Sequence, residues 1–260
     1  MTTSETVDEC GTLLLAAEST RSDVDPLTER WPDLSAETAY QIQDEVLRRR
    51  LVGGARVIGI KLGLTAVKKQ QQMNVTSPLT GWLTDEMVLP LGKPLPHQQL
   101  IHPRVEPEIV FVMGSRLEGP GVSAADALTA VDAVLCGLEV IDSRYRSFRF
   151  TLPDVIADNA SAAYFITSSQ RLAANSIDLS LETCELAMDG ETLAQGTGAD
   201  VHGGPAEALA FAANSLGRRG NAIEPGWVVL TGGITAAIAA QSSSRIEATF
   251  PNLGSIGLNC

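Results

Sequence analysis

The sequence lacks the residue patterns that mark most zinc-thiolate, disulfide-rich and nucleotide-binding proteins. Its four cysteines lie far apart with no C-x-x-C pair, which argues against a zinc site and a disulfide scaffold. The three histidines, His97, His102 and His202, show no metal-ligand spacing. Neither a GxxxxGK phosphate loop nor a GxGxxG fingerprint occurs, so a nucleotide cofactor is not indicated.

Positive charge and long apolar runs are also scarce. The chain has 19 Lys and Arg against 31 Asp and Glu, for a net charge of -12, which argues against binding to a phosphate backbone. No apolar stretch approaches the roughly 20 residues needed to cross a bilayer, and no secretion signal is recognisable. We therefore expect a cytoplasmic protein with neither a nucleic acid nor a membrane as partner. At 260 residues, 44% of them hydrophobic, the chain can form a sizeable packed core.

Helical patterns dominate the first part of the chain, and we expect a helical N-terminal segment over residues 1–55. One helix is expected to begin at Ser35 and to end at Gly53, because apolar residues recur between them at helical spacing. Two shorter helical patterns occur later, one capped by Ser123 and one beginning at Pro205.

From residue 56 the pattern changes to short β-rich runs separated by glycine and proline. These runs are "ARVIGIKLGLT", "RVEPEIVFVM", "AVLCGLEVIDS", "AAYFITSS", "CELAMDGETLAQG", "GWVVLTGGIT" and "RIEATF". We therefore expect an α+β protein in which the helical segment packs on a mixed, β-rich catalytic domain of residues 56–260.

Two acidic residues interrupt the apolar run "RVEPEIVFV". Side chains alternate across a strand, so Glu106 and Glu108 project to the same face with Cα atoms about 6.5 to 7 Å apart. Both carboxylates can then reach one hard cation. The alternative is a solvent-facing strand edge, which Pro107 would tolerate because it has no N–H to donate.

A third acid, Glu139, stands alone among apolar residues in "LCGLEVIDS". A buried carboxylate without a partner costs several kcal/mol or becomes protonated. Three acids from two strands that converge on one divalent ion remove this penalty. Magnesium or manganese suits such oxygen ligands, whereas zinc does not.

One lysine also lies in a core-like run. Lys61 stands between Ile60 and Leu62 in "VIGIKLGLT" and is one of only four lysines in the chain. A lysine in this setting must either extend its head to solvent or be held against negative charge. An edge-strand lysine with an exposed head is the alternative interpretation.

Five segments in a fixed order resemble a known group of proteins. They are "GIKLGLT" (59–65), "IHPRVEPEIVFV" (101–112), "LEVIDSRYRSFRF" (138–150), "DVIADNASA" (154–162) and "LTGGITAA" (230–237). Over nearly the whole chain the sequence resembles the 2-keto-4-pentenoate hydratase and 4-oxalocrotonate decarboxylase branch of the fumarylacetoacetate hydrolase superfamily. The resemblance implies a fumarylacetoacetase-like fold, a mixed β-roll or sandwich. It also implies that Glu106, Glu108 and Glu139 hold Mg²⁺, or Mn²⁺, and that Lys61 is catalytic.

One position distinguishes hydratases from decarboxylases within this branch. Hydratases typically carry an acid in a P-D-Y-G segment, whereas this chain has Leu79 in "SPLTG". Decarboxylases are similar to this chain there, and also at "DSRYRSFRF" and "TGGITAA". The chain departs from the family pattern at Thr80, which replaces a Tyr, and around 241–244, where a Pro-Gly-Asp turn is missing.

The resemblance therefore implies Mg²⁺-dependent decarboxylation of 2-oxo-3-hexenedioate to 2-hydroxypenta-2,4-dienoate, a step in the meta-cleavage degradation of aromatic compounds. Leu79 would belong to an apolar wall of the site. Candidate substrate contacts are Asn159, Ser161, Thr231 and Arg144. The alternative for Asn159 and Ser161 is an Asx turn, and for Thr231 it is a tight glycine turn. The alternative for Arg144 is a structural ion pair with Asp142 or another acid.

The sequence alone leaves two other functions open. A hydratase of the same branch would share the metal ligands, and a non-catalytic partner subunit of a hydratase complex would not need them. The expected partners are a small 2-oxo dicarboxylate substrate, a cognate hydratase and further copies of this chain in a homo-oligomer.

Overall fold

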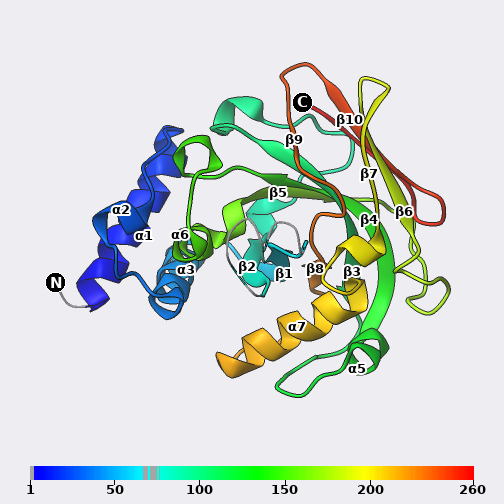
Figure 1. The fold of residues 1–260 in the computed structure, drawn as a ribbon, viewed down its shortest axis with the longest axis horizontal. Helices are drawn as coiled ribbons and strands as arrows, with labels where there is room; N and C mark the ends of the chain where they lie inside the picture. The colour runs from blue at the N-terminus through cyan, green and yellow to red at the C-terminus, as the bar shows by residue number, and fades with distance from the viewer. Residues whose placement is uncertain (1–2, 67–69, 71–74, 76) are drawn as a thin grey trace.

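The computed structural model describes residues 3–66, 70, 75 and 77–260. The N-terminal helices are α1 (Thr3–Thr20), α2 (Leu27–Arg30) and α3 (Ala36–Val52). They lie together at one side of the molecule, with α6 (Leu152–Ala157) beside them (Figure 1, left).

The expected limits of the long helix α3 are confirmed. The Ser35 hydroxyl accepts a hydrogen bond from the Thr38 amide, and Gly53 follows the last helical residue. Such a cap satisfies an amide that has no partner within the helix. None of the described helices is long and apolar enough to cross a membrane.

The centre of the molecule is a seven-stranded mixed sheet with the strand order β2-β1-β8-β3-β4-β5, and β9 pairs with β3 beside it. Its strands are β1 (Val57–Gly63), β2 (Leu79–Thr84), β3 (Arg104–Met113), β4 (Val131–Ile141), β5 (Ala162–Thr167), β8 (Val228–Leu230) and β9 (Ile238–Ala239). Only β1 and β8 are parallel neighbours among these described strands. The sheet curls until its outer strands, β2 and β5, contact each other (Figure 1).

A second, antiparallel sheet of order β11-β10-β6-β7 packs against β4. Its strands are β6 (Thr183–Met188), β7 (Glu191–Thr197), β10 (Arg245–Phe250) and β11 (Gly254–Asn259). Helices α5 (Ala124–Thr129) and α7 (Pro205–Arg218) contact each other near β3 (Figure 1). The main core joins Phe111 and Leu138 of the first sheet to Ile246 of the second and to Leu209 of α7. The expected α+β class, with a rolled mixed β-rich part, is confirmed.

A second hydrophobic cluster joins the N-terminal helices to the rest of the chain. Leu14 and Ile42 from these helices pack with Leu79, Tyr145 and Ile156. The change from helices to strands falls between α3 and β1, as the sequence predicts, but this cluster crosses it. A division at residue 55 into two units stays a prediction.

Some elements differ from the sequence expectation. The helical pattern that begins at Ser123 ends at Thr129, and Val131 starts β4, because this segment pairs with β3 along its whole length. Helix α6 and strands β2 and β11 were not expected. In the described part of the chain, short 3₁₀ turns occur at Asp85–Met87, His97–Gln99, Arg146–Phe148, Asn159–Ser161 and Gly198–Asp200.

Candidate active site

Three acidic side chains meet on one face of the central sheet. The antiparallel register of β3 and β4 places Glu106 opposite Glu139, with Glu108 two residues further along β3. Carboxylate oxygens of these residues lie within 4.8 Å of one another. Glu106, Glu108 and Glu139 are 7%, 0% and 1% exposed. Because β3 lies between β8 and β4, the alternative of a solvent-facing strand edge is wrong.

Glu108 and Glu139 accept few hydrogen bonds from the described residues. Gly232 N donates to Glu108 Oε2 at 2.7 Å, but Glu108 Oε1 and both Glu139 oxygens accept no hydrogen bond of normal geometry from the described residues. Burial raises the pKa of Glu108 well above its ordinary value, and the Glu139 carboxylate raises it further. Burial also raises the pKa of Glu139, against the effect of the Lys61 ammonium. Glu108 Oε1 and Glu139 Oε2, which are buried and accept no hydrogen bond from the described residues, fit a hard cation such as Mg²⁺.

Lys61 extends from β1 toward this cluster. β1 lies between β2 and β8 and the Lys61 side chain is 2% exposed, so the edge-strand alternative is wrong. Its Nζ lies 2.5 Å from Glu139 Oε1 and donates a hydrogen bond to the Ala160 carbonyl at 2.8 Å. The ammonium is thus held between a carboxylate and a carbonyl, where it offsets part of the glutamate charge.

The carbonyl that holds Lys61 belongs to a segment with unusual backbone geometry. Asn159, Ala160 and Ser161 have φ angles of 51°, 53° and 57°, in the left-handed region that residues other than glycine rarely adopt. The Asn159 amide fixes this segment to β2. Its Oδ1 accepts from Trp82 N at 2.7 Å, and its Nδ2 donates to Trp82 O at 2.9 Å. Asn159 therefore positions the backbone, and its contact with substrate stays a prediction.

Arg144 lies in a buried ion pair on the other side of this segment. Its Nε pairs with Asp158 Oδ1, and its Nη1 donates to the carbonyls of Asp142 and Ala162 at 2.7 and 3.1 Å. The Ser161 hydroxyl donates to Asp158 Oδ2 at 3.1 Å. Burial raises the pKa of Asp158 to about 6. The geometry favours the structural alternative for Arg144, with Asp158 as the acid.

Two other residues expected at the substrate, Thr231 and Leu79, are buried in the interior. Thr231 is fully buried, and its hydroxyl donates to the Ile109 carbonyl at 2.7 Å. Leu79 packs in the cluster shared with the N-terminal helices, directly behind Gly63. Neither Thr231 nor Leu79 lines the cavity beside Lys61, so this geometry does not support a direct contact of either with substrate.

A cavity of about 300 Å³ opens next to Lys61 and Glu106. Its apolar walls include Leu64, Phe148, Phe150 and Val155. Ser161 reaches it, and so does Arg104, a residue that the sequence analysis missed. The sequence contained the signal, because Arg104 precedes Glu106 by two positions and must lie on the same strand face.

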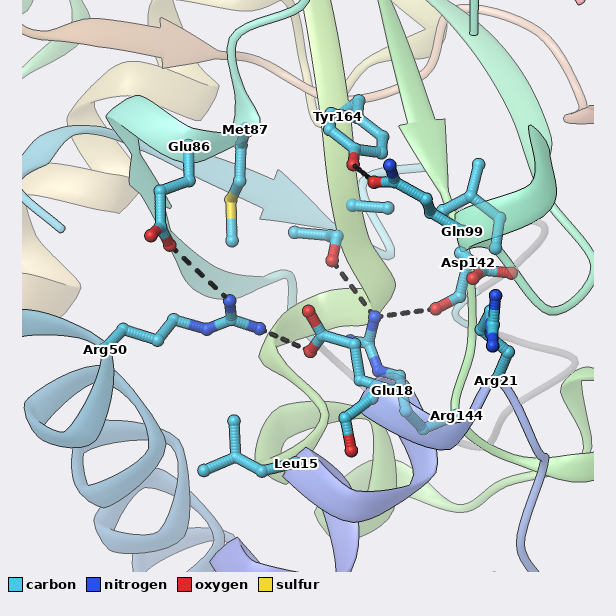
Figure 2. Close-up of a pocket in the computed structure, with 14 residues that line it drawn as sticks. Leu15, Glu18, Arg21, Arg50, Glu86, Met87, Gln99, Asp142, Arg144 and Tyr164 are labelled. Atoms are coloured by element: carbon cyan, nitrogen blue, oxygen red, sulfur yellow. Dashed lines mark hydrogen bonds and ion pairs between the residues drawn. The ribbon is translucent and has the colours of Figure 1, made fainter. Parts of the chain in front are cut away.

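A larger cavity of about 600 Å³ lies between α1 and β5. Arg144 is on its wall, and Arg50 pairs there with Glu18 and, at 3.9 Å, with Glu86 (Figure 2). None of the three clustered glutamates lines this space. The groups suited to chemistry therefore face the smaller cavity.

Comparison with known proteins agrees with this geometry. Residues 56–258 match the family model described as "Fumarylacetoacetate (FAA) hydrolase C-terminal". The chain belongs to the fumarylacetoacetate hydrolase family.

Within this family, the chain is 41% identical over 242 residues to a 4-oxalocrotonate decarboxylase of Pseudomonas sp. (strain CF600), covering 92% of this chain and 91% of that one. It is 40% identical over 217 residues to a 2-hydroxypent-2,4-dienoate hydratase of Pseudomonas putida, covering 82% and 97%. The structure of 4-oxalocrotonate decarboxylase from Pseudomonas putida G7, complexed with magnesium and adipate, superposes with a TM-score of 0.96 at 35% identity and covers 100% and 98% of the two chains.

Proposed function

We propose that this chain is a Mg²⁺-dependent decarboxylase that converts 2-oxo-3-hexenedioate (4-oxalocrotonate) to 2-hydroxypenta-2,4-dienoate and CO₂. The observation that carries the proposal is the buried cluster of Glu106, Glu108 and Glu139 beside Lys61, at the base of a mainly apolar cavity. The similarity to decarboxylases, one of them complexed with magnesium and the six-carbon diacid adipate, supports it.

Glu106, Glu108 and Glu139 would hold the metal, since buried carboxylate oxygens within reach of one another are the ligands that Mg²⁺ prefers. When bound, the ion supplies a Lewis acid for the negative charge that develops on the C2 oxygen of a 2-oxo acid. During the reaction the C5–C6 bond breaks and its electron pair moves through the C3–C4 double bond to the C2 oxygen.

Lys61 is the proton donor of this mechanism. The product needs one proton on the C2 oxygen, and the Lys61 ammonium is the cationic N–H group beside the glutamates. The Ala160 carbonyl and Glu139 fix the ammonium in place before substrate arrives.

The walls of the cavity favour loss of CO₂ over addition of water. Leu64, Phe148, Phe150 and Val155 offer no hydrogen bonds to a water nucleophile. Among the described residues, Glu106 is the only carboxylate that lines the cavity, and it belongs to the metal cluster. A separate acid that could manage the proton of an attacking water is therefore missing from this part of the chain.

A hydratase is the second candidate, because relatives with that name are up to 40% identical to this chain. The two activities are separated by incubating the purified protein and Mg²⁺ with each substrate. Release of CO₂ from 2-oxo-3-hexenedioate supports the decarboxylase. Consumption of 2-hydroxypenta-2,4-dienoate without CO₂ release from the diacid would instead establish the hydratase.

We also propose that the chain forms a homo-oligomer and binds a cognate hydratase, as the family resemblance implies. Light scattering on the isolated chain tests the first assembly, and co-elution with the hydratase tests the second. The complete set of site residues argues against a catalytically silent subunit. Metal-dependent turnover by the isolated chain would exclude that role.

A further inference from the structure

We propose that Arg104 binds the distal carboxylate of the substrate and makes the site selective for 2-oxo diacids over 2-oxo monoacids. This inference rests on the proposed function, since it assumes that the α-oxo acid end lies at the glutamate cluster. Arg104 thus takes the place of Arg144, which the sequence suggested as a candidate substrate contact.

Arg104 lies on β3 two residues before Glu106. Residues 104, 106 and 108 point to the same face of this strand, so one face carries a guanidinium followed by two carboxylates. A step of two residues along a strand is about 6.5 to 7 Å. An extended six-carbon diacid has a comparable length, so one end can lie at the glutamates while the other reaches Arg104. Both Arg104 and Glu106 line the same cavity.

Among the described residues, no carboxylate pairs with the Arg104 guanidinium. Its Cζ lies 4.1 Å from the centre of the Phe148 ring, and Phe148 packs against the ring of His102 at 4.8 Å. The His102 Nε2 lies 2.7 Å from the Ser143 carbonyl oxygen. This stack orients the plane of the guanidinium without using its N–H donors. Those donors remain for a bidentate contact with a ligand carboxylate.

Arg144 is poorly placed to bind the distal carboxylate. It lines the other cavity, and its donors bind Asp158, Asp142 and Ala162. Moving the Arg144 guanidinium would leave Asp158 buried without its cation, which is costly. Arg104 pays no such penalty when it binds an anion, because it has no acid to release within the described structure.

A contact with the distal carboxylate has a characteristic effect on the kinetics. That carboxylate carries its full charge in the bound substrate and loses it as the C5–C6 bond breaks. Arg104 therefore binds the substrate more strongly than the transition state. Replacing it should raise KM for the diacid and leave kcat unchanged or higher.

The test compares Arg104→Met with the wild type, and uses Arg146→Met as a matched control because Arg146 is an exposed arginine paired with Asp23 and Asp25. Calorimetry in Mg²⁺ measures the affinity of 2-oxoadipate and of 2-oxohexanoate, which differ only in the distal carboxylate. We expect Arg104→Met to weaken the binding of 2-oxoadipate about tenfold or more. The affinity for 2-oxohexanoate should stay within about twofold of the wild-type value. Arg104→Lys should keep part of the preference, and Arg146→Met all of it.

Equal weakening of both ligands, or of neither, by Arg104→Met would overturn the assignment. Binding of 2-oxohexanoate also shows that the variant is folded with an intact α-oxo acid site. If 2-oxohexanoate binds wild-type protein equally well with Mg²⁺ and with EDTA, the proposed function fails instead. The two failures are therefore distinguishable.

Discussion

The positive charge of Lys61 should raise kcat and weaken Mg²⁺ binding. Its ammonium lies 2.5 Å from Glu139 Oε1, so it would compete with a cation for the carboxylates, and in the proposed mechanism it supplies the proton. We expect Lys61→Met to lower kcat by a factor of about 10² to 10⁴ and to leave Mg²⁺ affinity unchanged or tighter. Steady-state kinetics and calorimetric Mg²⁺ titration measure the two effects. A loss of kcat explained by weaker Mg²⁺ binding would contradict this role.

The raised pKa values of Glu108 and Glu139 predict a pH-dependent metal effect on stability. In metal-free protein, burial keeps these carboxyls protonated above their ordinary pKa of 4.5. The folded state then binds more protons than the unfolded state, so this contribution to stability falls as pH rises from 4.5 through the folded pKa values. Mg²⁺ needs the deprotonated forms, so its stabilisation should grow over the same range.

Denaturant unfolding between about pH 5.5 and about pH 8, with Mg²⁺ or EDTA, measures this effect. The gap between the two stability curves should widen as pH rises, because protons no longer compete with the ion. In Glu108→Gln, the stabilisation by Mg²⁺ should be smaller and should depend less on pH. A gap of constant size in the wild type would show that these carboxyls do not change protonation when Mg²⁺ binds.

For single residues, the sequence predicts the positions of the charged side chains of the site better than those of the hydroxyl and amide side chains. Glu106, Glu108, Glu139 and Lys61 were identifiable because burying a charge is costly and strand alternation fixes its direction. Arg104 obeys the same alternation and could have been found. The direction of Arg144 could not, since it depends on Asp158, which lies 14 residues further along the chain.

Among the elements, the left-handed segment Asn159–Ser161 controls the position of Lys61. It is held to β2 by two hydrogen bonds between the Asn159 amide and the Trp82 backbone. Asn214 on α7 makes the same pair of bonds to the Val122 backbone, away from the site. The chain therefore contains a matched control for this contact.

We expect Asn159→Ala to lower the free energy of unfolding by about 2 kcal/mol, since two part-buried backbone groups lose their partners. It should also lower kcat about tenfold or more, because the Ala160 carbonyl no longer fixes the Lys61 ammonium. Mg²⁺ affinity should not change, because the glutamates lie on β3 and β4. Asn214→Ala should lose similar stability and keep its kcat. Equal effects of both variants on kcat would remove the positioning role of Asn159.

The elements with clear local signals were predicted well, and those set by distant contacts were not. Ser35 and Gly53 mark α3 in the sequence, and "RVEPEIVFVM" matches β3 residue by residue. The left-handed backbone of residues 159–161 has partners far away in the sequence. The Ala160 carbonyl accepts from Lys61 on β1, and the Asn159 side chain binds the Trp82 backbone on β2. The Ser161 carbonyl accepts from the Asp142 amide, which follows β4. Tertiary hydrogen bonds override local preference there.

At the scale of the whole molecule, the N-terminal helices share a core with the β-rich part. Ile42 is fully buried on α3 and packs in the cluster that also contains Leu79 and Ile156. We expect Ile42→Ala to lower the free energy of unfolding by about 2 to 5 kcal/mol. The control Val52→Ala, at a side chain that is 79% exposed, should change it by less than about 0.5 kcal/mol.

Because the core is shared, far-UV circular dichroism and tryptophan fluorescence should report one coincident transition in denaturant for both variants. Two separated transitions would show that residues 1–55 form an independent unit. The result therefore also tests the domain boundary that the sequence predicts.

The central claim is that Glu106, Glu108 and Glu139 together bind one divalent cation at the base of the Lys61 cavity. The most direct test is anomalous diffraction from crystals soaked with Mn²⁺ and 2-oxoadipate. We predict a single strong anomalous peak among the three carboxylates, with the α-oxo acid end of the ligand directed to it. An anomalous peak elsewhere, with the three carboxylates making no contact to the ion, would contradict the claim.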